Sequence, residues 1–345
     1  MPLHAAALAV LLSIAAAQSQ APPPPPPPPQ GSPLAAAAAA AAAARGEGGD
    51  PGTGKPLSIT FNWPVGMTAI VESERSRSQT MQGQAPKTTS MAVRYRMRVG
   101  AHRDGRVITY DGYEPMSEGF PAEGAAALEQ ALSTLMPSLI VSKTGEFLRV
   151  TDLAAMQKLM RELMGDLTEG GAQVPPNVKA MIDGMSSEEV LTGLASQEWQ
   201  IFAGAWAGFE GRIGEMAEVD AEEPLPIMPG LTVPMRSSFG ALRQAPCVTG
   251  AALDSCVVMQ LRSSVAPGGM QGLVQKLLEG AKGIPEVKFD RFDVTTDLKV
   301  TIEPRTARPH KITSVRNTEF TFKSPDGQSA SVSQVEQRNY RITYQ

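Results

Sequence analysis

Cysteine and histidine are scarce in this chain of 345 residues, which contains two cysteines and three histidines. His4 precedes an apolar N-terminal run, so only His102 and His310 belong to the part expected to fold, and we expect both on exposed loops. Few residues are left for a histidine-based catalytic pair or metal site. The H-E-x-x-H, G-x-S-x-G and calcium-loop patterns are also missing. The sequence therefore predicts no catalytic residue, no metal site and no cofactor.

An excess of positive charge is missing as well. The chain has 31 Lys and Arg against 35 Asp and Glu, a formal net charge of -4. Proteins that bind nucleic acid normally carry an excess of cations to neutralise phosphates, so we exclude that class. Residues 49–55 have the glycine and lysine spacing of a phosphate-binding loop, but Pro56 stands where a hydroxyl must hold magnesium. Nucleotide binding is excluded with it.

The apolar run near the N-terminus is too short to cross a bilayer. It covers residues 5–17 and ends in three alanines, which is a signal-cleavage pattern, although no Lys or Arg precedes it. We therefore expect residues 1–17 to be a signal peptide. The mature chain is then periplasmic or secreted, and it is not membrane-spanning.

Residues 18–55 are rich in Pro, Ala and Gly and include eight consecutive prolines. Such a segment has few side chains able to bury a core, so we expect a disordered linker. It is either a tether that holds the folded part away from a surface or a low-complexity segment without a specific role. Residues 56–345 are long enough for a single domain with a sizeable core.

The first and last thirds of this domain alternate apolar and polar residues, as half-buried strands do. In residues 57–63 the apolar residues fall on one face, and in residues 91–99 they alternate with Arg94, Arg96 and Arg98 on an expected solvated face. Further strands are expected at 107–110, 139–141, 147–150, 235–242, 257–261, 294–302, 311–315, 320–322, 330–335 and 340–344.

The central part has helical periodicity instead. Helices are expected at 122–136, 152–167 and 177–185, from a capping box at Ser186 and Glu189 toward Trp206, and at 269–281. The acidic run over residues 215–223 reads as a solvated linker. Strands at both ends around central helices predict an α+β fold, in which N- and C-terminal strands form one curved antiparallel sheet covered by a helical segment.

The two cysteines, Cys247 and Cys256, form an even count in a chain expected to be exported. Their spacing lacks the C-x-x-C pattern of a redox-active pair. A structural disulfide is the prediction.

Two apolar faces of the expected helices are the strongest candidates for a binding site. Methionines recur every four residues on one helix, and three aromatic residues share a face on another. Both patterns are usually core packing, and methionines of an exported protein can also bind Cu(I). Over a curved sheet they form the lining that a pocket for a lipid-like ligand requires. The candidate apolar-ligand lining is Met156, Met160, Met164, Trp199, Phe202 and Trp206.

The strand segments 58–63, 91–99 and 297–304, read together with the N-terminal signal, resemble bacterial periplasmic half-barrel proteins. Lipoprotein carriers are the known functional examples of that group. Residues 136–150 and 302–312 also resemble stretches of uncharacterised exported bacterial proteins. The resemblance implies a curved sheet under helices and a carrier-like role.

The leading hypothesis is therefore a non-catalytic periplasmic or secreted protein that binds an apolar or amphipathic, lipid-like ligand under its helical cover. The alternative is a structural or interaction module of the envelope with a fully packed core, whose partner is another envelope protein. An enzyme of unfamiliar type is the third class.

Overall fold

The structure is a computed structural model that describes residues 54–81, 84–116, 132, 136–166, 186–224, 232–266, 288–323 and 329–345. The expected signal peptide, nearly all of the expected linker, and the expected helices at 177–185 and 269–281 lie outside these residues. So does the expected helix at 122–136, apart from Leu132 and Met136. These expectations stay predictions.

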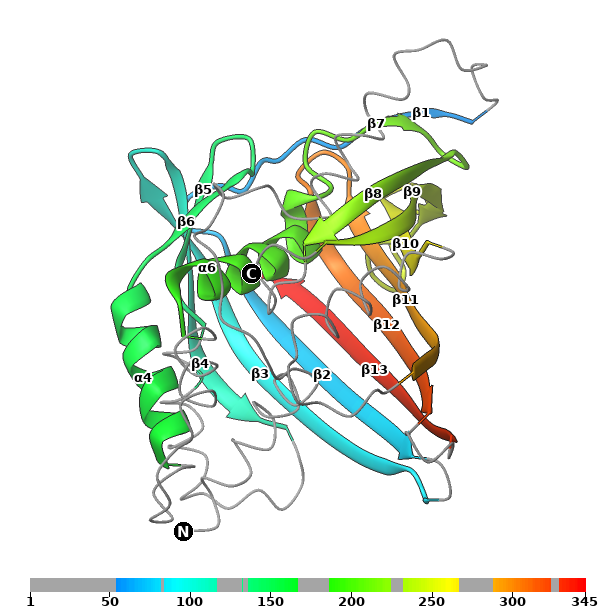
Figure 1. The fold of residues 1–345 in the computed structure, drawn as a ribbon. Helices are drawn as coiled ribbons and strands as arrows, with labels where there is room; N and C mark the ends of the chain where they lie inside the picture. Colours follow the sequence, from blue (N-terminus) through cyan, green and yellow to red (C-terminus); the bar gives the residue numbers. More distant parts are fainter. Residues whose placement is uncertain are drawn as a thin grey trace.

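An antiparallel sheet of 11 strands dominates the described structure (Figure 1). Its order is β6-β5-β4-β3-β2-β13-β12-β11-β10-β9-β8. Within this sheet every neighbouring pair is consecutive in the chain except β2 and β13, which join the N-terminal strands to the C-terminal ones. The strands are β2 (Thr68–Met81), β3 (Lys87–His102), β4 (Gly105–Pro115), β5 (Leu139–Ser142), β6 (Phe147–Val150), β8 (Met216–Pro224), β9 (Thr232–Ala245), β10 (Cys256–Val265), β11 (Lys288–Glu303), β12 (Arg308–Lys323) and β13 (Ser329–Tyr344).

Helices are a minor part of the described residues. They are α4 (Leu153–Asp166), α6 (Glu188–Trp199) and the π-helical turn η1 (Gln200–Gly204), which continues α6. The α+β prediction is therefore wrong, because the described structure is mainly β. Strands at 311–315 and 320–322 merge into β12, and those at 330–335 and 340–344 merge into β13. Their polar middle sections conceal this continuity, since apolar alternation is lost where a strand face is not packed in apolar core.

Residues 57–63 have the predicted alternation but do not join the large sheet. Ile59, Phe61 and Trp63 are buried, yet only β1 (Pro56–Ser58) is a strand, paired with β7 (Glu210–Arg212) in a second, two-stranded sheet. Beyond it the backbone bonds to two different segments: Ile59 N–H donates to Phe209 O at 2.8 Å, and Thr60 N–H donates to Pro304 O at 2.8 Å.

The acidic run at 215–223 is an edge strand, not a linker. Most of it belongs to β8, which pairs with β9, and Asp220 forms an ion pair with Arg236 at 3.0 Å across that pair. Ala217 and Val219 alternate with the acids and pack against the core. The five carboxylates make this segment strongly polar overall, so its two small apolar residues are easily overlooked. Their two-residue spacing is nevertheless that of a strand.

Helix α6 lies across one end of the long strands (Figure 1). Its N-cap is Ser187, one residue later than predicted, and the Ser187 hydroxyl accepts a hydrogen bond from Val190 N–H at 3.3 Å. At its other end η1 adds a wider turn, and Phe202 and Ala203 of this turn are buried. Among the described residues no helix is both long and apolar enough to cross a bilayer.

Aromatic side chains hold α6 against the rest of the molecule. The Trp199 ring meets those of Phe61 and Trp63 edge to face, with centroids 5.9 and 5.3 Å away. Trp199 Nε1–H donates to the carbonyl of Gly145, in the turn between β5 and β6, at 2.7 Å. The helix is therefore fixed by one hydrogen bond and three buried rings, which set where the residues next to Trp199 point.

Gly145 is a position where we expect even a methyl group to destabilise the fold. It has φ +92°, and a Cβ there would come within 2.7 Å of the Phe61 ring. We expect Gly145→Ala to lower the free energy of unfolding by about 2–3 kcal/mol, measured by denaturant titration. Gly250→Ala is the matched control, because Gly250 has φ +85° and no heavy atom within 4 Å of a Cβ. It should cost only about 1 kcal/mol, and equal losses would contradict the crowding at Phe61.

Candidate functional site

The aromatic half of the predicted ligand lining lies in the core. Trp199, Phe202 and Trp206 are nearly fully buried beneath α6 and η1. Trp206 stacks on Phe239 with ring centroids 5.3 Å apart, and Phe202 meets Tyr340 edge to face at 5.2 Å. Protein side chains therefore occupy the space next to these rings.

The methionine half is on a different element. Met156 is buried on α4, Met160 is half-buried, and the side chain of Met164 lies outside the described residues. Helix α4 lies beside β4 rather than across the sheet (Figure 1). The six residues are thus divided between α4 and the segment that runs from α6 through η1 to the turn at Trp206, and their role as a ligand lining stays a prediction.

Tyrosines gather on the face of the sheet that α6 contacts, which no pattern in the sequence predicted. The chain has five tyrosines, and four of them lie on the helix-covered face of the sheet: Tyr95, Tyr110, Tyr113 and Tyr340. The Tyr95 ring lies 5.9 Å from Tyr110 and 5.5 Å from Tyr113. Burial, with the nearby Glu198 charge, raises the pKa of Tyr95, Tyr110 and Tyr340 above the ordinary value. These phenols therefore stay neutral and can donate hydrogen bonds.

Glu198 connects the helix to this tyrosine cluster. It is the second-last residue of α6, and its Oε1 accepts a hydrogen bond from the Tyr340 hydroxyl at 2.8 Å. Its Oε2 lies 3.9 Å from Arg338 Nη1. The Tyr113 hydroxyl oxygen is buried and has no hydrogen-bond partner among the described residues. One buried donor on this face is thus free to bind a polar group.

Next to the tyrosines, arginines surround a single carboxylate. Arg75 Nη2 lies 2.7 Å from Glu336 Oε1, and Arg338 Nε lies 2.8 Å from the same oxygen. The strand register places Arg77 of β2 and Arg316 of β12 directly opposite Glu336 of β13, on either side. Residues opposite each other in a sheet share a face, so all of these groups lie on the side that α6 covers. We call Arg75, Arg77, Arg316 and Arg338 the arginine cluster.

The arginine cluster controls the ionisation of Glu336. The side chain of Glu336 is only 11% exposed. Burial opposes its charge, but the Arg338 and Arg75 guanidinium groups outweigh burial and hold the pKa of the carboxyl below its usual value. Glu336 therefore stays charged down to acid pH.

Positive charge exceeds negative charge in this region. The described parts of β2, β12, β13 and α6 bring the four guanidinium groups of the arginine cluster to two carboxylates, those of Glu336 and Glu198. Arg75 and Arg338 have side chains only 25% and 32% exposed. Farther along the same face, Val294 and Val332 are buried. A half-buried cationic site with apolar neighbours on both sides is suited to an anionic group attached to an apolar body.

The opposite face of the sheet is lined mainly by polar and charged side chains. It carries a shallow hollow of about 620 Å³ over β8 to β12, lined mainly by Ser, Thr and charged side chains. Its cations have carboxylate partners: Arg236 lies 3.0 Å from Asp220, and Arg262 and Lys299 lie 3.5 and 3.4 Å from Asp297. The predicted solvated row behaves in the same way, with Arg94 bound to Glu72 at 2.8 Å and Arg98 bound to Asp111 at 2.7 Å. We therefore place no ligand on either surface.

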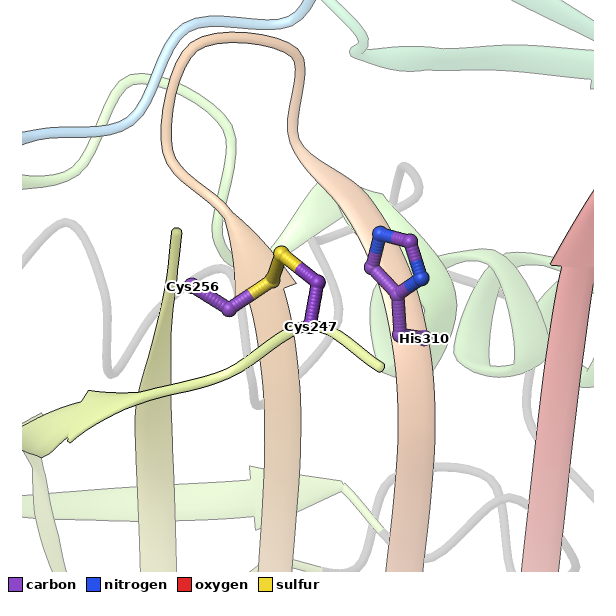
Figure 2. A group of neighbouring side chains, drawn as sticks. All are labelled: Cys247, Cys256 and His310. Carbon is purple, nitrogen blue, oxygen red and sulfur yellow. A yellow bond between two sulfur atoms is a disulfide. The ribbon is translucent and has the colours of Figure 1, made fainter. Parts of the chain in front are cut away.

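The predicted disulfide between Cys247 and Cys256 is confirmed, and it has an unexpected neighbour. His310 lies near the start of β12, half-buried beside the disulfide, and is not on the exposed loop that was predicted (Figure 2). Its ring lies 5.3 Å from that of Tyr344, and its Nδ1 is buried without a partner among the described residues. His102 lies at the end of β3, also in a strand, and its Nδ1 accepts a hydrogen bond from Asp104 N–H at 3.2 Å.

Replacing Glu336 should change both the stability and its dependence on pH. Because the folded-state pKa is depressed, the ion pairs stabilise the fold fully above the ordinary value of 4.5 and are lost as pH falls through the folded-state pKa. We expect Glu336→Gln to lower the free energy of unfolding by about 2 kcal/mol at pH 7 and to remove this acid-dependent part.

Denaturant titrations between neutral and acid pH measure both effects. Glu74→Gln, at an exposed position on the other face of β2, is the matched control and should leave the pH profile unchanged. Identical profiles for the two variants would contradict the assignment.

Comparison with known proteins yields little. No protein-family model matches the chain, and no curated protein matches it. Among solved structures, a TodX monoaromatic hydrocarbon channel mutant is 8% identical, with 83% of this chain and 96% of that chain covered and a TM-score of 0.21. An outer membrane channel from Pseudomonas putida F1 is also 8% identical, with 86% and 100% covered and a TM-score of 0.17. Scores this low carry no argument about fold or function.

Proposed function

We propose that the protein is a non-catalytic binding protein of the bacterial envelope that holds the anionic group of an amphipathic ligand on the helix-covered face of its sheet. The observation that carries this proposal is the arginine cluster, which brings four guanidinium groups to a face with two carboxylates. A surplus of guanidinium charge attracts an anion, and the exposed Arg316 is accessible to one.

The chemistry of the cluster suits a carboxylate or phosphate head group. Guanidinium groups bind both through paired N–H donors, and such charge-assisted bonds are stronger than neutral ones. Arg75 and Arg338 are already engaged with Glu336, whereas Arg316 lies opposite it in the register and contributes to lowering its pKa. Arg77 already donates a hydrogen bond from Nη2 to Gln334 Oε1 at 2.6 Å, so Arg316, which is exposed, is the residue we assign to ligand binding.

The apolar part of the ligand would lie along the same face. Val332 of β13 and Val294 of β11 are on the far side of the arginines, and the tyrosine cluster is on the near side. The Tyr113 hydroxyl, which has no hydrogen-bond partner among the described residues, adds a neutral donor there. This arrangement retains the predicted lipid-like ligand and adds polar contacts on the sheet, which the predicted apolar lining did not include.

Export supports an envelope location. The expected signal peptide at residues 1–17 and a disulfide inside the folded part agree with an oxidising compartment. The expected linker over residues 18–55 would then act as a tether.

A second candidate is favoured by the packed rings at Trp199, Phe202 and Trp206. In that case the protein is a structural or interaction module of the envelope, and the arginine cluster only joins the strands. The two candidates differ in whether a small amphipathic anion binds.

Binding of a fluorescent fatty acid, 11-(dansylamino)undecanoic acid, separates the two candidates. We expect the wild-type chain to bind it and to bind its methyl ester much more weakly, because the ester lacks the anionic group. Arg316→Gln should raise the dissociation constant about tenfold by removing one charge-assisted contact.

Arg341→Gln is the matched control, because Arg341 is exposed on the opposite face of the neighbouring strand β13. It should change the dissociation constant less than about twofold. If the wild-type chain binds neither probe, or binds acid and ester equally, the packed module replaces the binding protein.

A further inference from the structure

The disulfide and His310 bring three metal-ligating side chains together. The ligand atoms of Cys247, Cys256 and His310 all lie within 4.8 Å of one another. Figure 2 shows the imidazole beside the two sulfur atoms. Cys256 begins β10, Cys247 follows β9 and His310 belongs to β12, so the sheet itself fixes the grouping. This group is separate from the arginine cluster and independent of the proposed function.

The imidazole of His310 has a polar atom that the oxidised fold does not use. Its Nδ1 is buried without a hydrogen-bond partner among the described residues. Figure 2 shows Nδ1 on the side of the ring that faces away from the disulfide and Nε2 nearer to the sulfur atoms, so Nε2 is the nitrogen available to a metal bound beside the sulfurs.

We propose that reduction of the Cys247–Cys256 disulfide creates a zinc site whose ligands are the two thiolates and His310. Zinc takes two sulfurs and one imidazole in known coordination chemistry, with bonds of about 2.3 and 2.0–2.1 Å, and a water in the fourth position. These bond lengths place the ligand atoms of a tetrahedral site roughly 3.5–4 Å apart. The sulfurs therefore need to separate once the bond between them breaks, and the imidazole nitrogen, within 4.8 Å of both, needs at most a small shift.

A reductant can reach the disulfide from one side. Cys256 is fully buried, but Cys247 is partly exposed at the base of a turn whose tip carries the exposed Leu253. The turn is held by Ser255, whose hydroxyl accepts a hydrogen bond from Cys247 N–H at 3.0 Å and donates one to Ala252 O at 2.7 Å. Cys247 is thus the more exposed of the two cysteines and the one at which we expect an external thiolate to attack.

The chemistry requires a dithiol reductant and a two-electron oxidant. A dithiol transfers two electrons and two protons to the disulfide, giving two cysteine thiols and the disulfide of the reductant. Zinc binding then displaces the two thiol protons. Hydrogen peroxide reverses the cycle: two thiolates lose one electron each and form the disulfide, peroxide takes up two protons to give two waters, and zinc is released.

Metal titration of the reduced, untagged full-length chain tests the proposal. The disulfide is opened with a phosphine or dithiol, the reductant is removed without oxygen, and Co²⁺ followed by Zn²⁺ is added. We expect one metal ion per chain, a thiolate-to-cobalt absorption band that zinc displaces, and no such band for the oxidised chain. Peroxide should release the zinc and restore the disulfide, as detected with a chromogenic zinc chelator and a thiol count.

Two histidine variants separate a three-ligand site from simple binding by two thiols. His310→Ala should weaken zinc binding by at least about tenfold while the thiol count stays at two. His102→Ala, at the end of β3, should bind zinc as the wild type does.

If the reduced chain loses its fold without metal, the thermal unfolding midpoint is the second measurement. Zinc should raise it for the reduced wild type and not for His310→Ala. The proposal is overturned if reduced wild type binds no metal, if His310→Ala binds zinc as tightly as wild type, or if zinc leaves the midpoint of the reduced wild type unchanged.

Discussion

Pairing between β2 and β13 is the constraint on which the rest of this structure depends. It connects the first long strand to the last and turns two runs of hairpins into one sheet of 11 strands. The same register sets Arg75 and Arg77 beside Arg338 and Glu336, more than 200 residues apart in the chain. Two arginines directly opposite each other repel, and the Glu336 carboxylate between them removes that repulsion.

Helix α6 contacts both an apolar, aromatic region and a charged region of this face. Trp199 and its aromatic neighbours exclude water at one end of the long strands, and Glu198, the residue before Trp199, contacts Tyr340 and Arg338. One helical turn therefore joins a dry aromatic core to a charged region. Ligand binding, if it follows the proposed route, would act on the ion pairs that also hold the helix down.

The disulfide serves a separate part of the sheet. It closes the turn between β9 and β10 at one end of the strands, whereas the arginine cluster lies midway along β2, β12 and β13. Substitutions in one region need not disturb the other, because residues this far apart share no partners. The proposed zinc chemistry and the proposed anion binding can therefore be tested independently.

The sequence by itself determined the local structure and the covalent link. The alternation of apolar and polar residues predicted β3, β10 and β11, and the helical period predicted α4 and α6. The count of two cysteines predicted the disulfide. The strand and helix patterns can be read from the sequence because they depend on residues close together in the chain. Only the tertiary structure decided that β dominates, that residues 59–63 stay outside the large sheet, and that tyrosines and arginines share the face of the sheet that α6 contacts. The physical reason is that Arg77, Glu336 and Arg316 become neighbours through the register of β2, β13 and β12, and a register between distant strands leaves no periodic trace in the chain.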